Sequence, residues 1–122
     1  MKPQLNHTIV SAHDREGSAS FLSEILGLEP PTLFGRFLVV EAGNGVSLSF
    51  IHTDAEISGQ HYAFLVTEKE FDSIFSRIAS RELSYWADPG LSRPGEINRN
   101  DGGRGVYFSC LLYTSPSPRD RS

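Results

Sequence analysis

The stretch HYAFLVTEKEFDSIFSRI, residues 61–78, decides the fold. Its first six residues are an apolar run that predicts a strand over 61–66. Thr67 then stands three residues before Glu70, which is the spacing of a helix capping box. The apolar residues that follow recur at the helical period: Phe71, Ile74, Phe75 and Ile78. A strand is therefore expected to lead directly into an amphipathic helix.

The same order of elements occurs once before, in the first half of the chain. LNHTIV, residues 5–10, predicts a strand, and the next stretch predicts a helix that Asp14 caps and Gly27 ends. Residues 36–42 and 46–52 predict two strands joined by a tight GNG turn. The chain thus begins with a strand, a helix and a hairpin, and the pattern restarts at His61.

A long loop separates the two strands predicted after the second helix, at 83–88 and 103–109. It runs from Pro89 to Gly103, which is long for a hairpin connection and hints at function or mobility. Its polar side chains either lie over a site or are simply solvated, and both interpretations stay open for Arg93, Glu96, Asn98, Arg99 and Asn100. Arg36 and Arg104 are likewise either anion-binding groups or ordinary strand-end arginines.

Composition and charge limit the classes of function. A chain of 122 residues suits one domain, and its net charge of −4 provides no basic surface for nucleic acid. No apolar run is long enough to span a membrane, and the N-terminus lacks the features of a signal peptide, so we expect a cytoplasmic protein that acts on small molecules. The single cysteine, Cys110, excludes a disulfide framework and a thiolate zinc cluster.

Two histidines occupy equivalent places in the two repeats. His7 and His61 each stand near the start of a predicted leading strand, so pairing the repeats can bring them to face one shared cavity. On spacing alone, each is more often a hydrogen-bonded core or surface residue than a ligand. Two neutral imidazoles with one carboxylate suit Zn, Mn, Fe, Ni or Co, and such a set leaves coordination positions open for substrate.

LNHTIV, SASFLSEILGLEP, QHYAFLVTEKEFDSIFSRI and GGRGVYFS together resemble the vicinal oxygen chelate (VOC) superfamily, which includes glyoxalase I. The resemblance implies an α+β fold of paired βαβββ modules in one domain over 1–109, with module one at 5–52 and module two at 61–109. It also implies a divalent metal, with His7 and His61 as ligands, a small-molecule substrate and a homodimer. No catalytic residue is assigned.

The resemblance stops after Ser109. The superfamily usually continues there with a D-P-x-G-H/N turn and a last strand that carries a glutamate ligand, which would fall at position 117, where Ser117 stands. Residues 110–122 instead resemble a translated sequencing adapter, so we expect a non-native tail and a missing last strand. A genuine disordered Ser/Pro tail is the alternative.

The reaction type stays open among dioxygenase, lyase or isomerase, and thiol transferase. Ser47 and Ser49 stand where glyoxalase I relatives usually carry a further glutamate, and Ile9 stands where fosfomycin transferases usually carry threonine. Extradiol dioxygenases usually add a histidine after the second helix, and none follows Glu68. The sequence favours a metalloenzyme that is impaired in this form. A metal-free drug- or metabolite-binding protein, similar to bleomycin-resistance proteins, is the alternative.

Overall fold

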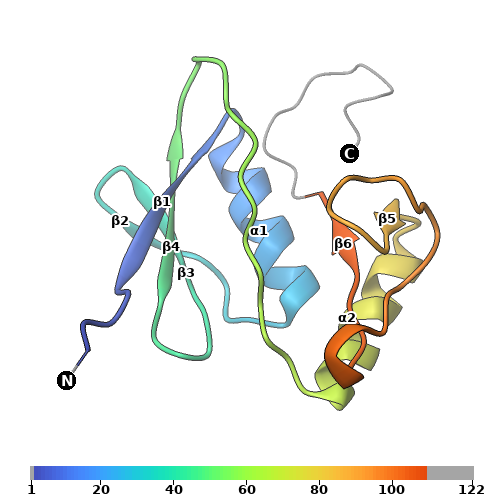
Figure 1. Cartoon of the computed structure of the whole chain (residues 1–122). Helices are drawn as coiled ribbons and strands as arrows, with labels where there is room; N and C mark the ends of the chain where they lie inside the picture. The colour runs from blue at the N-terminus through green and yellow to red at the C-terminus, as the bar shows by residue number, and fades with distance from the viewer. Residues whose placement is uncertain (1, 110–122) are drawn as a thin grey trace. The chain divides into compact units, whose positions relative to one another are not determined.

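The computed structural model describes residues 2–109, which divide into two compact units, 2–59 and 60–109. The first unit is a four-stranded sheet with one helix (Figure 1). Its strands lie in the order β1-β4-β3-β2, with β1 parallel to β4 and the other pairs antiparallel. The elements in chain order are β1 (His7–Ala12), α1 (Arg15–Leu26), β2 (Thr32–Phe34), β3 (Phe37–Glu41) and β4 (Ser47–His52).

Local signals position α1 as the sequence predicts. The Asp14 carboxylate accepts a hydrogen bond from the Gly17 amide at 3.0 Å, which satisfies an otherwise unpaired donor of the first turn. Gly27 ends the helix at a φ of 70°, a left-handed conformation that glycine adopts without steric cost. The tight turn between β3 and β4 is confirmed as well, since Gly45 has a φ of 84°.

The core of the first unit lies between α1 and one face of the sheet. Alternate strand residues point toward the helix and are almost fully buried: Val10, Ala12, Val40, Leu48 and Phe50. Ile25 of α1 packs among them with no exposed surface. The side of the sheet turned away from α1, hereafter the opposite face, carries the strand residues that alternate with these buried ones, such as Ile9 and Ser49.

The second unit contains α2 (Glu68–Ser80), β5 (Tyr85–Trp86), the short 3₁₀ turn η1 (Asn100–Gly102) and β6 (Tyr107–Phe108). The predicted capping box is confirmed, because the Thr67 hydroxyl accepts from the Glu70 amide at 3.1 Å and the Glu70 carboxylate accepts from the Thr67 amide at 2.8 Å. β5 pairs with β6 in antiparallel fashion. The Phe75 ring of α2 packs edge-on against Tyr85 of β5, with ring centroids 5.1 Å apart.

The predicted strand over residues 61–66 is wrong, because this stretch pairs with no strand among residues 2–109. The first unit shows the reason. There the leading strand β1 lies at the edge of the described sheet and pairs with β4, the last strand of the repeat. The equivalent last strand of the second repeat would follow β6 and fall outside the described residues. A strand needs a partner for its backbone groups, and Leu65 is accordingly fully exposed.

The α+β fold class is confirmed, with differences at the ends of strands. The first strand occupies 7–12 rather than 5–10, and β2 is a short strand that the sequence did not predict. The strands expected at 83–88 and 103–109 each keep two residues. The predicted tail at 110–122 lies outside the described residues. Within the described part of the chain, no helix is long and apolar enough to cross a membrane.

Candidate functional site

His7 is the first residue of β1 and its side chain is exposed. Its ring nitrogen Nδ1 lies 2.7 Å from the Asn6 side-chain oxygen, which accepts a hydrogen bond when Nδ1 carries the proton. That tautomer leaves the lone pair of Nε2 available. A histidine ligand is commonly oriented in this manner, with one nitrogen held by a hydrogen bond and the other directed at the metal. His7 therefore suits a ligand role.

His61 belongs to the second unit and lies in the extended stretch that precedes α2. It is exposed, and its ring packs edge-on against Tyr107 of β6, with centroids 5.6 Å apart and an interplanar angle of 75°. The contact brings the predicted ligand to the strand after which the third ligand is expected. The position of that third ligand, 117, is outside the described residues.

The two histidines lie in different units, His7 in the first and His61 in the second. Among residues 2–109, no three His, Cys, Asp or Glu side chains gather into a group that could hold a metal ion. The imidazoles fit the donor type that a divalent transition metal needs, whereas a carboxylate partner does not join either of them within the described residues. The ligand roles of His7 and His61 stay predictions.

The sheet register places a carboxylate on the same face as His7. Ser47 of β4 pairs with His7 of β1 on one side and with Glu41 of β3 on the other. Paired residues share a face of a sheet, so His7, Ser47 and Glu41 form one row across three strands on the opposite face. The sequence predictions missed Glu41, because its place depends on the register of three strands; the signal available was its position at the end of the 36–42 strand.

A second row runs beside the first. Ser49 pairs with Ile9 on β1 and with Val39 on β3. Ser49 is only 8% exposed, and its hydroxyl has no hydrogen bond within residues 2–109. Buried hydroxyl groups nearly always have a partner, so this one is an exception that calls for an explanation.

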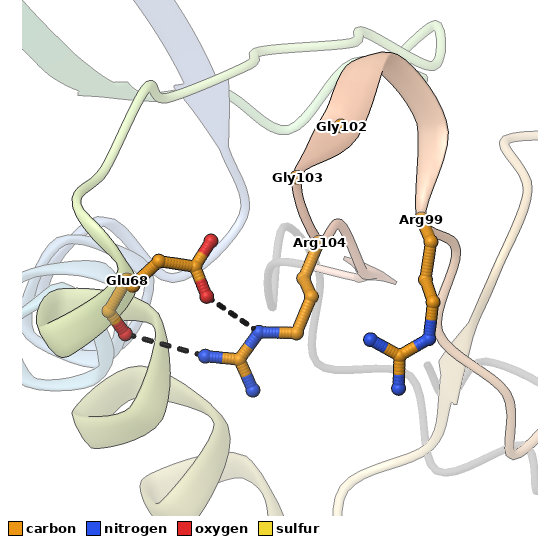
Figure 2. Close-up of a pocket in the computed structure, with 5 residues that line it drawn as sticks. All are labelled: Glu68, Arg99, Gly102, Gly103 and Arg104. Atoms are coloured by element: carbon orange, nitrogen blue, oxygen red, sulfur yellow. Dashed lines mark hydrogen bonds and ion pairs between the residues drawn. The ribbon is translucent and has the colours of Figure 1, made fainter.

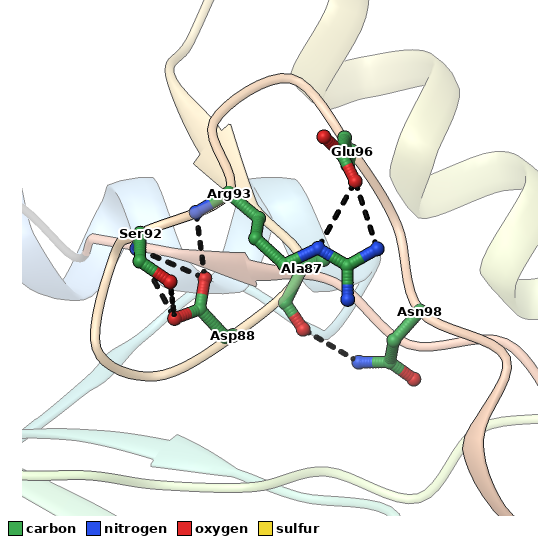
Figure 3. A network of polar contacts seen from close by, with 6 residues as sticks. All are labelled: Ala87, Asp88, Ser92, Arg93, Glu96 and Asn98. Atoms are coloured by element: carbon green, nitrogen blue, oxygen red, sulfur yellow. Dashed lines mark hydrogen bonds and ion pairs between the residues drawn. The ribbon is translucent and has the colours of Figure 1, made fainter.

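The long loop of the second unit is held by its own polar contacts (Figure 3). Asp88 accepts hydrogen bonds from the Ser92 hydroxyl at 2.6 Å and from the Ser92 and Arg93 amides. The Ser92 hydroxyl, followed by the two amides, keeps the pKa of Asp88 below its usual value, because these donors stabilise the carboxylate. Arg93 pairs with Glu96, and Asn98 donates to the Ala87 carbonyl. These contacts favour the structural interpretation of the loop.

A pocket of about 560 Å³ opens beside that loop and is lined by Glu68, Arg99, Gly102, Gly103 and Arg104 (Figure 2). The Arg104 guanidinium forms ion pairs with the Asp72 carboxylate at 2.7 Å and with the Glu68 carboxylate at 2.8 Å, and these carboxylates raise its pKa. Its charge also lies 4.5 Å from the centre of the Phe71 ring. Arg104 is thus occupied by its own unit, which favours the strand-end interpretation over anion binding.

Comparison with known proteins places the chain in a family. No family model matches the sequence, and a search of curated proteins finds no match. Solved structures do match: oxidase ChaP-H1 is 59% identical over 89% of this chain and 88% of its own, with a TM-score of 0.87. Oxidase ChaP-H2 is 57% identical over 92% and 88%, with a TM-score of 0.89. The fosfomycin resistance protein FosX of Mesorhizobium loti covers 98% of both chains at 18% identity and a TM-score of 0.65.

The chain belongs to the vicinal oxygen chelate superfamily. The similarity to FosX concerns the fold alone, and it agrees with the α+β architecture described above. VOC membership makes the opposite face a candidate binding surface, because in the fold that the sequence resembles the sheet faces of the modules form a cup. The polar side chains that the register places on that face of the first unit include His7, Glu41, Ser47 and Ser49.

Proposed function

We propose that the protein is a metal-dependent oxidase that acts on a small oxygenated molecule. The observation that carries the proposal is the 57–59% identity to two oxidases over about nine-tenths of the chain. Fold alone does not select a reaction, since one fold supports many chemistries. Similarity at this level across nearly the whole chain favours oxidation over the lyase, isomerase and thiol-transferase reactions of more distant VOC proteins.

His7 and His61 are the residues of this chain that would hold the metal. When bound, a divalent metal would act as a Lewis acid toward two adjacent substrate oxygens, and a redox-active metal would also supply the chemistry that uses dioxygen. Zn has no redox chemistry, so oxidase function favours Fe or Mn among Zn, Mn, Fe, Ni and Co. Two histidines with one carboxylate form the facial set typical of non-haem Fe(II) oxygenases. The Asn6 side-chain oxygen, 2.7 Å from Nδ1 of His7, would favour the tautomer that leaves Nε2 for the metal.

The third ligand is proposed to follow Ser109 in the native reading frame. The stretch 61–66 and β6 would then gain the partner strand that β4 supplies to β1 in the first unit. Sequencing of the source DNA across the Ser109 codon tests this directly. A frame that continues into an Asp-Pro-x-Gly turn and a strand bearing glutamate supports it, whereas a genuine Ser/Pro tail favours the metal-free binding protein. A homodimer that shares modules is part of the same proposal, and light scattering measures it.

The decisive experiment is anaerobic calorimetric titration of Fe²⁺ or Mn²⁺, followed by oxygen uptake with a panel of hydroxylated aromatic compounds. His7→Ala and His61→Ala should each lower metal affinity by more than about a hundredfold, since loss of an outer-shell partner alone costs about 10–100-fold. The control is His52→Ala, because that exposed imidazole is paired with Asp54. Saturable binding of the compounds with no metal uptake by the chain carrying the native frame would replace the oxidase with the binding-protein alternative.

A further inference from the structure

The opposite face of the first unit changes character along its strands. The row of His7, Ser47 and Glu41 is wholly polar. The next row is mixed, with the Ser49 hydroxyl between Ile9 and Val39. In the row after it, Ser11 pairs with Ile51, and Phe34 pairs with Phe37 on the same face of the sheet. Small-molecule sites combine an apolar lining with a few placed polar groups, and this face has that composition.

Two polar groups on this face have no hydrogen-bond partner in the part of the chain that the structure describes. The Ser49 hydroxyl is buried to more than nine-tenths and has no hydrogen bond among the described residues. The Glu41 carboxylate likewise forms no hydrogen bond or ion pair within residues 2–109. Glu41 is two strand spacings from His7, about 10 Å between Cα atoms, with Ser47 between them. A molecule lying over Ser47 is therefore within reach of the side chains of His7 and Glu41.

We propose that Glu41, Ser47 and Ser49 form the polar recognition group for a substrate that carries a hydroxyl group on an apolar, aromatic body. Glu41 accepts a hydrogen bond from the substrate hydroxyl, and the Ser49 hydroxyl bonds a second substrate oxygen. The apolar body lies over Ile9 and Ile51, and Ile9 is 53% exposed although it sits in the middle of a strand. This inference rests on the proposed function, which it deepens by naming a substrate class and its orientation.

The test measures binding in the metal-free full chain, with EDTA present, so that it does not depend on oxidase activity. The probes are 2-naphthol and its methyl ether, which differ in the hydroxyl donor that Glu41 would bind. Backbone amide shifts of ¹⁵N-labelled protein give both affinities and the location of binding. We expect 2-naphthol to bind about tenfold more tightly than the ether, because a hydrogen bond to a charged acceptor contributes at least that factor.

Variants assign the preference to Glu41. Glu41→Ala should reduce the tenfold preference to less than about twofold, whereas Glu41→Gln should keep part of it, because its amide oxygen still accepts a hydrogen bond. Glu29→Ala is the matched control, an exposed glutamate outside the sheet that should leave both affinities unchanged. Ser49→Ala should weaken both probes.

Three outcomes overturn the inference: neither probe binds up to its solubility limit, Glu41→Ala keeps the preference, or the shifted amides lie only around the Arg99 pocket of the second unit. The result is separable from that of the proposed function. A chain that fails to take up oxygen with Fe²⁺ can still show the 2-naphthol preference. Conversely, loss of the preference leaves the metal titration of His7 and His61 unaffected.

Discussion

Replacement of Ser49 by alanine should stabilise the ligand-free protein. The Ser49 side chain is 8% exposed, and its hydroxyl has no partner within residues 2–109. Burying an unpaired hydroxyl costs about 1–3 kcal/mol in protein mutational data. Ser49→Ala removes that cost and leaves a space of one oxygen atom between Ile9 and Val39, which offsets part of the gain. We expect the free energy of unfolding to rise by about 1 kcal/mol, equivalent to roughly 4 °C in melting temperature for a chain of this size.

Thermal and urea unfolding followed by circular dichroism measure this change. The control is Ser92→Ala, because the Ser92 hydroxyl donates to the Asp88 carboxylate at 2.6 Å and its loss should lower the melting temperature. Opposite signs for the two serine variants support an unpaired Ser49 hydroxyl. If Ser49→Ala destabilises the protein as much as Ser92→Ala, the hydroxyl has a partner inside the fold, and its assignment to substrate recognition is refuted.

Three further predictions follow from local contacts. Thr67→Ala should lower the free energy of unfolding by about 1 kcal/mol in urea titrations, because it removes the N-cap of α2. The pKa of Asp88 is lowered in the folded protein, so its carboxylate stabilises the loop above the unfolded pKa and loses this effect as the pH falls through the folded pKa. The amide signals of the loop should therefore broaden below about pH 4, and Asp88→Asn should abolish that transition. Leu65→Lys should reduce self-association in light scattering without lowering the melting temperature, because Leu65 is fully exposed on an extended segment that pairs with no strand of the described part of the chain.

The first repeat could be predicted well because its signals are local. Asp14, Gly27 and the 43–45 turn each act within a few residues, and the structure uses them as expected. The strand at 61–66 could not be judged in this way. An apolar run shows that a segment is suited to a sheet, but a strand forms only where another strand supplies hydrogen bonds. That partner would come from beyond Ser109, and no local pattern reports its availability.

The candidate site was predictable only in part, for a related reason. His7 and His61 attract attention as single residues at equivalent places, so sequence alone is enough to select them. Glu41 is an ordinary glutamate at the end of a strand until two registers are known, one parallel between β1 and β4 and one antiparallel between β3 and β4. The burial of Ser49 likewise depends on its neighbours in the adjacent strands, Ile9 and Val39. Long-range pairing, which the sequence pattern does not encode residue by residue, supplies this half of the site.

The two faces of the first sheet differ in how well their side chains are buried and hydrogen-bonded, and this difference favours a binding role for the opposite face. On the face toward α1, apolar side chains such as Phe50 and Val40 are buried and satisfied, as stability requires. On the opposite face, an isoleucine is half exposed, and a buried serine hydroxyl and a carboxylate in the row of His7 have no partner within residues 2–109. Each of these features costs stability or adds none, and replacing them would be a simple route to a more stable chain. Natural sequences keep such departures chiefly where function needs them. Their concentration on one face, beside the predicted metal ligand, is the physical reason to look there for the substrate.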